Sequence, residues 1–376
     1  FPLKGRRIIR GEIKHLKYFS FTREVNNTTK YSRRVEDQLK VIIREFEPDI
    51  VHIFGTEFPH ALSMVKAFDN PERTLVSLQG LCSVIAEHYY AGLPISVLYK
   101  CTLRDFLMQN NIVNQRKKFI KRGQFEVATL KGVNYIIGRT EWDKICASRI
   151  NPKAKYYSVN ESLRENFYHD EWTYENCTKY TVFMSQGNYS IKGLHFAIEA
   201  MGEVVKKFPQ SHLFIAGTNI IKNDNIKDNL KRTYYSKYVE NLIKRYDLTN
   251  NITFTGHLNE IQMSAQLLNS HVFISTSSIE NSPNSLCEAM MLGVPSIASN
   301  VGGVSSLMTH QKEGLLYQYD APYMLAYYVQ QLFKDHELAI RLSSNAKQRA
   351  AATHDRYKNT KDIFELYNTV FNKSVF

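Results

Sequence analysis

The sequence has few cysteines and lacks the hydrophobic runs that would place it in a membrane. Its 376 residues include only five cysteines, an odd and scattered set without a CxxC pair. This pattern argues against a disulfide framework and against a zinc site, so a reducing cytoplasm is the simpler expectation. No run of about 18 apolar residues is present, and no secretory signal pattern stands at the start.

Acidic residues are scarce in the first half of the chain. Residues 1–165 contain 28 lysines and arginines against 17 acids, whereas residues 166–376 contain 20 against 19. Almost the whole net charge of +12 therefore belongs to the first half. This asymmetry suggests an anionic partner such as an anionic membrane surface, and a plain solvated basic surface is the alternative.

The densest basic cluster is "NQRKKFIKRG" at 114–123. On a helix Lys117, Lys118, Lys121 and Arg122 would span one broad face. Each basic residue near an anionic bilayer contributes about 1 kcal/mol, which favours reversible peripheral binding to such a membrane. Only Phe119 interrupts the cluster, and single-stranded nucleic acid needs more aromatic side chains, so we expect no nucleic-acid partner.

Short apolar runs alternate with helical patterns along the whole chain. We expect strands at 49–55, 74–80, 133–140, 180–186, 212–218, 251–256, 271–277 and 295–300. We expect helices at about 33–46, 104–131, 193–207, 228–246, 260–269, 284–292 and 321–334. Such alternation predicts an α/β protein with parallel sheets, and the length favours two doubly wound domains. The polar, aromatic stretch 166–180 is the predicted boundary.

Two glutamates eight positions apart stand at a predicted strand-to-helix turn, in "IENSPNSLCEAMMLG". The amides of the helix N-terminus, from about Ser282 to Leu286 except Pro283, would form an anion site. An acid beside an anion site needs another partner, and sugar or ribose hydroxyls would suit Glu280 and Glu288. The alternative is that Glu280 caps the helix and that Glu288 is an ordinary helix side chain that binds no ligand.

A second turn carries one basic residue, in "YTVFMSQGNYSIKGLHFAIEAM". Lys192 would stand at the start of the next helix, where a lone ammonium suits a diphosphate. A solvated surface lysine is the alternative. This alternative is less favoured because a strand, Gly187 and the Lys192-Gly193 pair occur together at one predicted sheet edge.

Taken together, these motifs resemble the retaining glycosyltransferases of family 4, which have the GT-B fold. The resemblance rests on "ENSPNSLCEAMMLGVPSIASNVGGVSSLM", "QGNYSIKG" and "FTGHL", and its spacing holds from about residue 133 to 350. It implies two Rossmann-like domains that face each other across a cleft. We expect an N-terminal acceptor-side domain at 1–168, a nucleotide-sugar domain at 169–355, and a helix at 356–376 that packs back on the first domain.

The resemblance also implies roles for residues of the second half. Glu280 would bind the donor sugar and support positive charge at the anomeric carbon, Glu288 would hold the ribose, and Lys192 would neutralise the diphosphate. The other implied donor-binding residues are Gly187, Asn188, Gly256, His257, Ser282, Pro283, Asn284, Ser285 and Leu286. No metal-binding DxD pair stands in the turns, so we expect neither a metal ion nor another cofactor.

The sequence departs from the family pattern at several positions. Asn188 stands where the family has arginine after the turn glycine, and Phe54 replaces a histidine. Glu57 and His60 are candidate replacements for that histidine, and Gln79 stands where the family often has another histidine. Arg139 or Lys144 could supply the missing positive charge. The acceptor-side candidates are thus Glu57, His60, Gln79 and Arg139. The segment "HYYAGLP" (88–94) could be an acceptor-side lid. The family's first strand and glycine-rich loop do not precede Phe1, so either the sequence is trimmed there or the first domain lacks that part.

The expected activity is transfer of a hexose from a nucleotide-diphosphate donor, with UDP the most frequent nucleotide in such enzymes. The expected acceptor is a glycan or a lipid-linked glycan of cell-surface polysaccharide, such as capsule. A UDP-sugar 2-epimerase is one alternative. A catalytically silent GT-B subunit that binds or chaperones a partner transferase is the other, although it would be expected to lose Glu280, Glu288 and Lys192.

Overall fold

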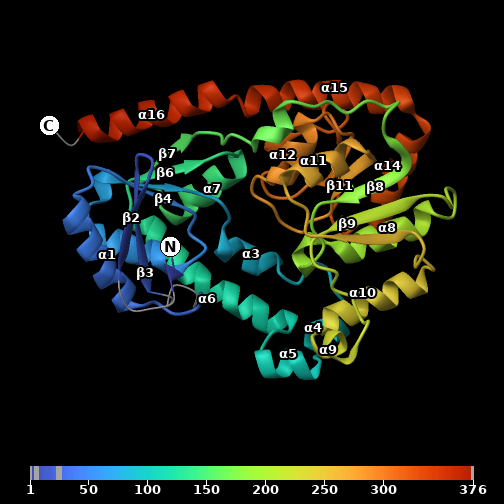
Figure 1. The fold of residues 1–376 in the computed structure, drawn as a ribbon, viewed down its shortest axis with the longest axis horizontal. Coiled ribbons are helices and arrows are strands. Elements are labelled where there is room, and N and C mark those ends of the chain that lie inside the picture. Colours follow the sequence, from blue (N-terminus) through green and yellow to red (C-terminus); the bar gives the residue numbers. More distant parts are fainter. Residues whose placement is uncertain (1, 4–7, 23–27, 374–376) are drawn as a thin grey trace. The chain divides into compact units, whose positions relative to one another are not determined.

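The computed structural model describes residues 2–3, 8–22 and 28–373. The expectation of a trimmed end or an incomplete first domain concerns Phe1, which lies outside the described residues. The chain divides into two units (Figure 1). Unit 1 comprises Phe1–Glu87, Lys117–Asn160 and Arg356–Phe376, and unit 2 comprises His88–Arg116 and Glu161–Asp355. The expected domain limits differ from this division chiefly at 88–116, which belongs to unit 2.

Unit 1 is built on a parallel four-stranded sheet. Its strands lie in the order β4 (Val51–Phe54), β5 (Thr74–Ser77), β6 (Tyr135–Gly138) and β7 (Lys155–Ser158). A second sheet has the order β1 (Pro2–Leu3), β3 (Leu16–Thr22), β2 (Ile9–Ile13), with β2 and β3 antiparallel. Both central strands, β5 and β6, are buried along their whole length, because helices cover both faces of the four-stranded sheet.

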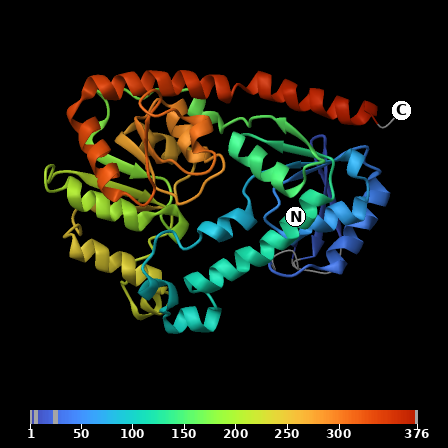
Figure 2. The ribbon, with the colours of Figure 1, turned by 180° about the vertical axis from the view of Figure 1, so that it is seen from behind.

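The helices of unit 1 supply the two halves of its core. They are α1 (Arg33–Phe46), α2 (Pro59–Phe68), α3 (Cys82–His88), α6 (Ile112–Lys131), α7 (Glu141–Ile150) and α16 (Arg356–Lys373), with the 3-10 turn η2 (Pro71–Arg73). The start of α6, residues 112–116, belongs to unit 2. Leu130 and Ala147, from α6 and α7, pack with Val76 on one face of the sheet. Leu366 and Val370 of α16, the red helix that leads to the C-terminus in Figure 2, pack with residues of β5 and β6 on the other face.

Unit 2 is built on a parallel six-stranded sheet. Its strands are β8 (Thr178–Met184), β9 (His212–Ala216), β10 (Ile252–Gly256), β11 (Ser270–Ser275), β12 (Ser296–Ser299) and β13 (Leu315–Tyr317). Their spatial order is β10-β9-β8-β11-β12-β13. The chain thus winds outward from β8 in one direction and from β11 in the other. In such doubly wound sheets ligands bind where the order reverses, which here is the carboxyl end of β8 and β11.

Helices and two 3-10 turns complete unit 2. They are α4 (Ile95–Tyr99), α5 (Leu103–Met108), η3 (Glu165–Tyr168), η4 (Ser190–Lys192), α8 (Leu194–Val204), α9 (Ile226–Leu230), α10 (Tyr234–Arg245), α11 (Glu260–Leu268), α12 (Asn284–Met291), α13 (Val304–Leu307), α14 (Pro322–Lys334) and α15 (His336–Thr353). Helix α8 packs on α10 and α14, and α12 packs on α15. Within the described ranges, no helix has the length and apolar character to cross a bilayer.

Two predicted helices are each divided in the structure. The helix expected at 104–131 is α5 followed by α6, because Gln109 takes a left-handed conformation and its amide closes the end of α5. Asn111 then accepts a hydrogen bond from the amide of Asn114 at 2.8 Å, as a cap at the start of α6 does. The helix expected at 228–246 is α9 and α10, which Thr233 separates as the N-cap of α10.

Candidate functional site

The turn after β8 and the loop after β11 are joined at the switch point of the sheet. The Thr276 hydroxyl donates to the carbonyl of Lys192 at 2.7 Å, and the Ser278 amide donates to the carbonyl of Ile191 at 2.8 Å. Gly193 has φ +71°, and a Cβ there would lie 1.8 Å from the Thr276 carbonyl oxygen. Only glycine permits this approach, so the Lys192-Gly193 pair fixes the turn against β11.

Lys192 and Glu280 meet at this junction. The Lys192 Nζ lies 2.6 Å from Glu280 Oε1, and the Ser277 hydroxyl donates to the same oxygen at 2.6 Å. The two charged side chains are 26% and 14% exposed, so solvent screens their attraction only in part. An ammonium has three N–H donors and one faces Glu280, which leaves two for a ligand. Among the described residues none donates to Glu280 Oε2.

The backbone of Glu280 is held by the glycine pair after β12. The Gly303 amide donates to the carbonyl of Glu280 at 3.0 Å. Gly302 has φ +52°, and a Cβ there would lie 1.9 Å from that carbonyl oxygen. The "GG" of the sequence motif therefore positions the loop that carries Glu280.

Helix α12 begins beside this ion pair, with Pro283 at its N-cap. The amides of Asn284 and Ser285 donate to no acceptor among the described residues, so both can donate to a ligand. The Leu286 amide differs from these two, because it donates to the Pro283 carbonyl at 3.0 Å. Leu286 itself is fully buried, while Ser282 and Pro283 form the buried approach to the helix.

Glu288, one turn inside α12, pairs with Arg164. Arg164 Nε and Nη2 donate to the two Glu288 oxygens at 2.8 and 2.9 Å. The Glu288 side chain is 6% exposed, and that of Arg164 is 43% exposed. Burial raises the pKa of Glu288, although the hydrogen bonds from Arg164 act in the opposite direction. Each carboxylate oxygen has a second lone pair, so the pair does not prevent Glu288 from accepting ribose hydroxyls.

The ends of β8, β9 and β10 carry the other predicted donor-binding residues. Gly187 is buried at the end of β8, and Asn188 follows it half-buried. At the end of β10, the Gly256 carbonyl accepts from the Gly217 amide at 2.8 Å. His257 Nε2 lies 3.1 Å from the Thr218 hydroxyl, so the ends of β9 and β10 are joined by polar contacts.

Three of the four acceptor-side candidates lie together at the strand ends of unit 1. Arg139 Nη2 lies 3.5 Å from Gln79 Oε1, and the Glu57 carboxylate lies beside the backbone of Gly55 and Gly80. These positions are the carboxyl ends of β4, β5 and β6. His60 is placed differently, because it stacks on Phe58 with ring centroids 5.5 Å apart, and burial lowers its pKa.

The basic cluster of α6 presents a narrower face than predicted. Lys117 and Lys121 are exposed, but so is the apolar side chain of Ile120. Arg122 is not part of the exposed face, since its Nε donates to the Glu57 carbonyl at 2.7 Å. In the parts of the chain that the structure describes, no group of three or more His, Cys, Asp or Glu side chains is arranged to hold a metal ion.

Two residues of the site were missed from the sequence. Ser277 lies in the serine-rich run "STSSIE" three positions before Glu280, so a local signal existed. Arg164 lies 124 positions before Glu288, and nothing in the sequence connects the two. Its contact comes from the way η3 is placed against α12.

Residues 167–349, which include all six strands of the unit 2 sheet, match the family model described as Glycosyl transferases group 1. Among curated proteins, YtcC of Bacillus subtilis (strain 168) is described as a glycosyltransferase. It is 25% identical to this chain over 281 residues. That alignment covers 70% of this chain and 66% of YtcC. The chain thus spans just under two thirds of this relative's length.

Two solved structures share the architecture of the chain. Sucrose-phosphate synthase from Thermosynechococcus elongatus aligns with a TM-score of 0.72 and 16% identity, over 99% of this chain and 87% of its own. Anabaena HepE, in complex with UDP and glucose, aligns with a TM-score of 0.66 and 16% identity, over 90% of this chain and 81% of its own. These likenesses confirm the predicted fold class: an α/β protein with parallel sheets, of the GT-B type.

Proposed function

We propose that this chain, similar over residues 167–349 to group 1 glycosyltransferases, transfers a sugar from a nucleotide-diphosphate donor with retention at the anomeric carbon. One observation carries the proposal. At the switch point of the six-stranded sheet, Lys192 and Glu280 meet at 2.6 Å beside the N-terminus of α12. A cation, a carboxylate and free helix amides at this point suit a sugar diphosphate.

In the proposed reaction the bond between the anomeric carbon and the diphosphate oxygen breaks, and a bond to an acceptor hydroxyl oxygen forms. The hydroxyl proton passes to the departing diphosphate. Lys192 donates its two remaining N–H bonds to phosphate oxygens, and the amides of Asn284 and Ser285 donate from α12. The free oxygen of Glu280 accepts from a donor-sugar hydroxyl and stabilises positive charge at the anomeric carbon.

The proposed nucleotide is UDP, and Glu288 would hold its ribose. The complexes of HepE with UDP and glucose support this choice by analogy of fold. Thermal unfolding of the chain with UDP, GDP, ADP and CMP tests it. A ligand at 100 times its dissociation constant stabilises the folded state by about 2.7 kcal/mol. UDP should raise the melting temperature of the chain. If only GDP or only ADP raises it, that nucleotide replaces UDP as the proposed donor nucleotide.

The proposed acceptor is a glycan or a lipid-linked glycan of cell-surface polysaccharide such as capsule. Lys117 and Lys121 of unit 1 are exposed and could bind an anionic bilayer. A lipid-linked acceptor would be anchored in that bilayer. In this proposal the chain binds the inner membrane face peripherally and reversibly.

The activity is tested with UDP-sugars in the presence and absence of glycan acceptors. UDP release that depends on the chain, and an acceptor product whose anomeric configuration matches that of the donor, support a retaining transferase. Tight UDP binding without sugar transfer or donor hydrolysis would instead indicate a silent subunit. An inverted product would leave transfer in place and overturn retention.

A further inference from the structure

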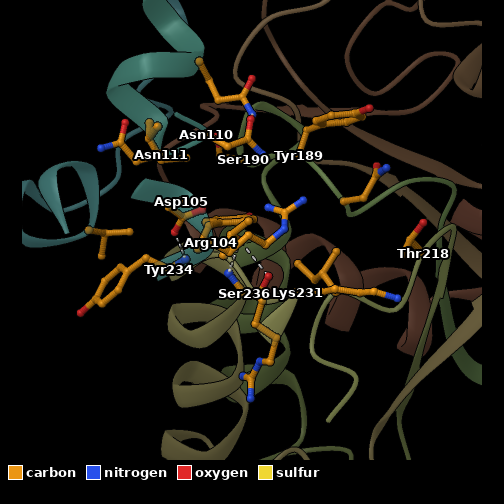
Figure 3. Close-up of a pocket in the computed structure, with 18 of the residues that line it drawn as sticks. Arg104, Asp105, Asn110, Asn111, Tyr189, Ser190, Thr218, Lys231, Tyr234 and Ser236 are labelled. Carbon is orange, nitrogen blue, oxygen red and sulfur yellow. Dashed lines mark hydrogen bonds between the residues drawn. The ribbon is translucent and has the colours of Figure 1, made fainter. Parts of the chain in front are cut away.

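Unit 2 contains a cavity of about 490 Å³. Figure 3 shows the side chains that line it. The segment around α5 and the start of α6 lines one side, and α9 and α10 with the turn after β8 line the other. Lys192, Glu280 and Glu288 do not line it. Its volume lies within the range of small-molecule sites.

Buried polar atoms without hydrogen-bond partners are concentrated in this cavity. Asp105 Oδ1, Asn188 Oδ1, Ser190 Oγ, Arg104 Nη1 and Arg232 Nε all belong to lining residues, and none has a partner among the described residues. Folded proteins leave few buried polar atoms unpaired, because each costs about 1–3 kcal/mol. Five around one cavity indicate a polar ligand.

Asp105 is the most buried of these groups, at 1% exposed. Its Oδ2 accepts from the Tyr234 amide at 2.7 Å and from the Thr102 amide at 3.1 Å, which ties α5 to the first turn of α10. Its Oδ1 has no partner. The carboxylate is thus held rigidly by one oxygen, and the other can accept a hydrogen bond from a ligand in the cavity.

Positive charge outweighs negative charge among the side chains that face the cavity. Lys100, Arg104 and Lys231 line it, and none of the three has a carboxylate within ion-pair distance among the described residues. Arg232 is different, because its Nη2 pairs with Glu240 while its Nε remains unpaired. These cations disfavour a metal ion, and the buried Asp105 disfavours a simple inorganic anion.

We infer that this cavity binds a sugar that carries a carboxylate or a phosphate. The acid group would accept from Arg104 and Arg232, and sugar hydroxyls would donate to Asp105 and Asn188. Ser190 can do either. Such a ligand satisfies donors and acceptors together, which a neutral sugar or a bare anion does not.

The position of the cavity links this ligand to the proposed transfer. Asn188 and Ser190 stand in the same short turn as Lys192, so the cavity and the proposed donor site share one backbone segment. If the proposed function holds, the ligand is an acidic residue of the acceptor glycan. The same chemistry could come from a free sugar acid or sugar phosphate.

The test is direct binding to the full chain, by calorimetry or ligand-observed NMR, with the methyl glycosides of glucuronate and glucose and with glucose 6-phosphate. An acidic sugar should bind at least about tenfold more tightly than methyl glucoside. Arg104→Gln should weaken acidic-sugar binding by about 10- to 100-fold, the usual effect of losing a charge-assisted hydrogen bond. Lys237→Gln is the matched control, since Lys237 is exposed on α10 outside the cavity.

An oligosaccharide that ends in glucuronate separates the two sources. Tighter binding of the oligosaccharide supports an acceptor glycan, and equal binding of the monosaccharide supports a free ligand. Equal binding of methyl glucoside, or equal losses in Arg104→Gln and the control, would overturn the inference. UDP binding is measured in the same samples. If UDP binds and the acidic sugars do not, only the inference about the cavity is refuted. If the acidic sugars bind and UDP does not, only the proposed function is refuted.

Discussion

The Arg164–Glu288 pair allows a quantitative prediction about unit 2. Arg164→Ala leaves a carboxylate that is 6% exposed without its cation. Breaking a fully buried pair costs about 3–5 kcal/mol, but solvent reaches the 43% exposed Arg164 side chain and lowers the loss. We therefore expect a loss of about 2 kcal/mol at pH 8, or roughly 4–8 °C in melting temperature for a unit of this size.

The same variant should depend on pH in a defined direction. Burial raises the pKa of Glu288 in the folded state, and removal of the arginine raises it further because that hydrogen bond favours the ionised form. Only the ionised carboxylate is destabilised by burial without its cation. The loss caused by Arg164→Ala should therefore be greatest above the folded pKa and should shrink as the pH falls through it toward the ordinary glutamate range.

Thermal unfolding at pH 8 and pH 5 measures both effects. Lys347→Ala is the control, because it breaks the more exposed pair between Lys347 and Glu171 and should cost less than about 0.5 kcal/mol. In a Glu288→Gln background, Arg164→Ala should cost much less than in the wild type. An equal cost in both backgrounds, or a loss that does not change with pH, would refute the reasoning.

Three further predictions concern the proposed activity. Lys192→Ala should lower transfer by about 100-fold or more while the chain remains folded, and wild-type turnover in this variant would remove Lys192 from the diphosphate site. Transfer should survive EDTA, whereas loss in EDTA with recovery on adding manganese would mean that a metal neutralises the phosphates. The chain should co-sediment with anionic liposomes at 50 mM salt, less at 300 mM, and less when Lys117, Lys118 and Lys121 become serine. Equal pelleting with zwitterionic vesicles would contradict the membrane proposal.

Eight of the ten strands in the two parallel sheets could be predicted, because each of the eight is a short apolar run. They are β4 to β12 apart from β7, whereas β7 and β13 were not predicted. Strand β7 was not predicted because its sequence, "KYYS", contains no apolar run. The strand lies at the edge of the sheet and is only half-buried. Two long helices were predicted as continuous although the structure divides them, where Gln109 ends α5 and Thr233 begins α10, since capping there depends on backbone conformation.

The site could be predicted residue by residue but not as a set of contacts. Lys192 and Glu280 were chosen from separate turns, and their meeting follows from the strand order, which places β8 beside β11. The pairing of Arg164 with Glu288 arises only from tertiary packing, and the hydrogen bond from the Leu286 amide to the Pro283 carbonyl arises from helix geometry. The assignment of segment 88–116 to unit 2, and hence the cavity that this segment lines, had no sequence signal beyond the suggested lid at 88–94.

The central claim is that Glu280, paired with Lys192, stabilises charge at the anomeric carbon of a bound nucleotide sugar. Its most direct test is the rate of sugar transfer from a saturating UDP-sugar by the wild type and by Glu280→Gln. The substitution keeps the size and removes the negative charge. Glu203→Gln, at an exposed position on α8, is the matched control. The account predicts a kcat about 100-fold lower for Glu280→Gln, with UDP binding retained and the control unchanged. An unchanged kcat in Glu280→Gln would contradict it.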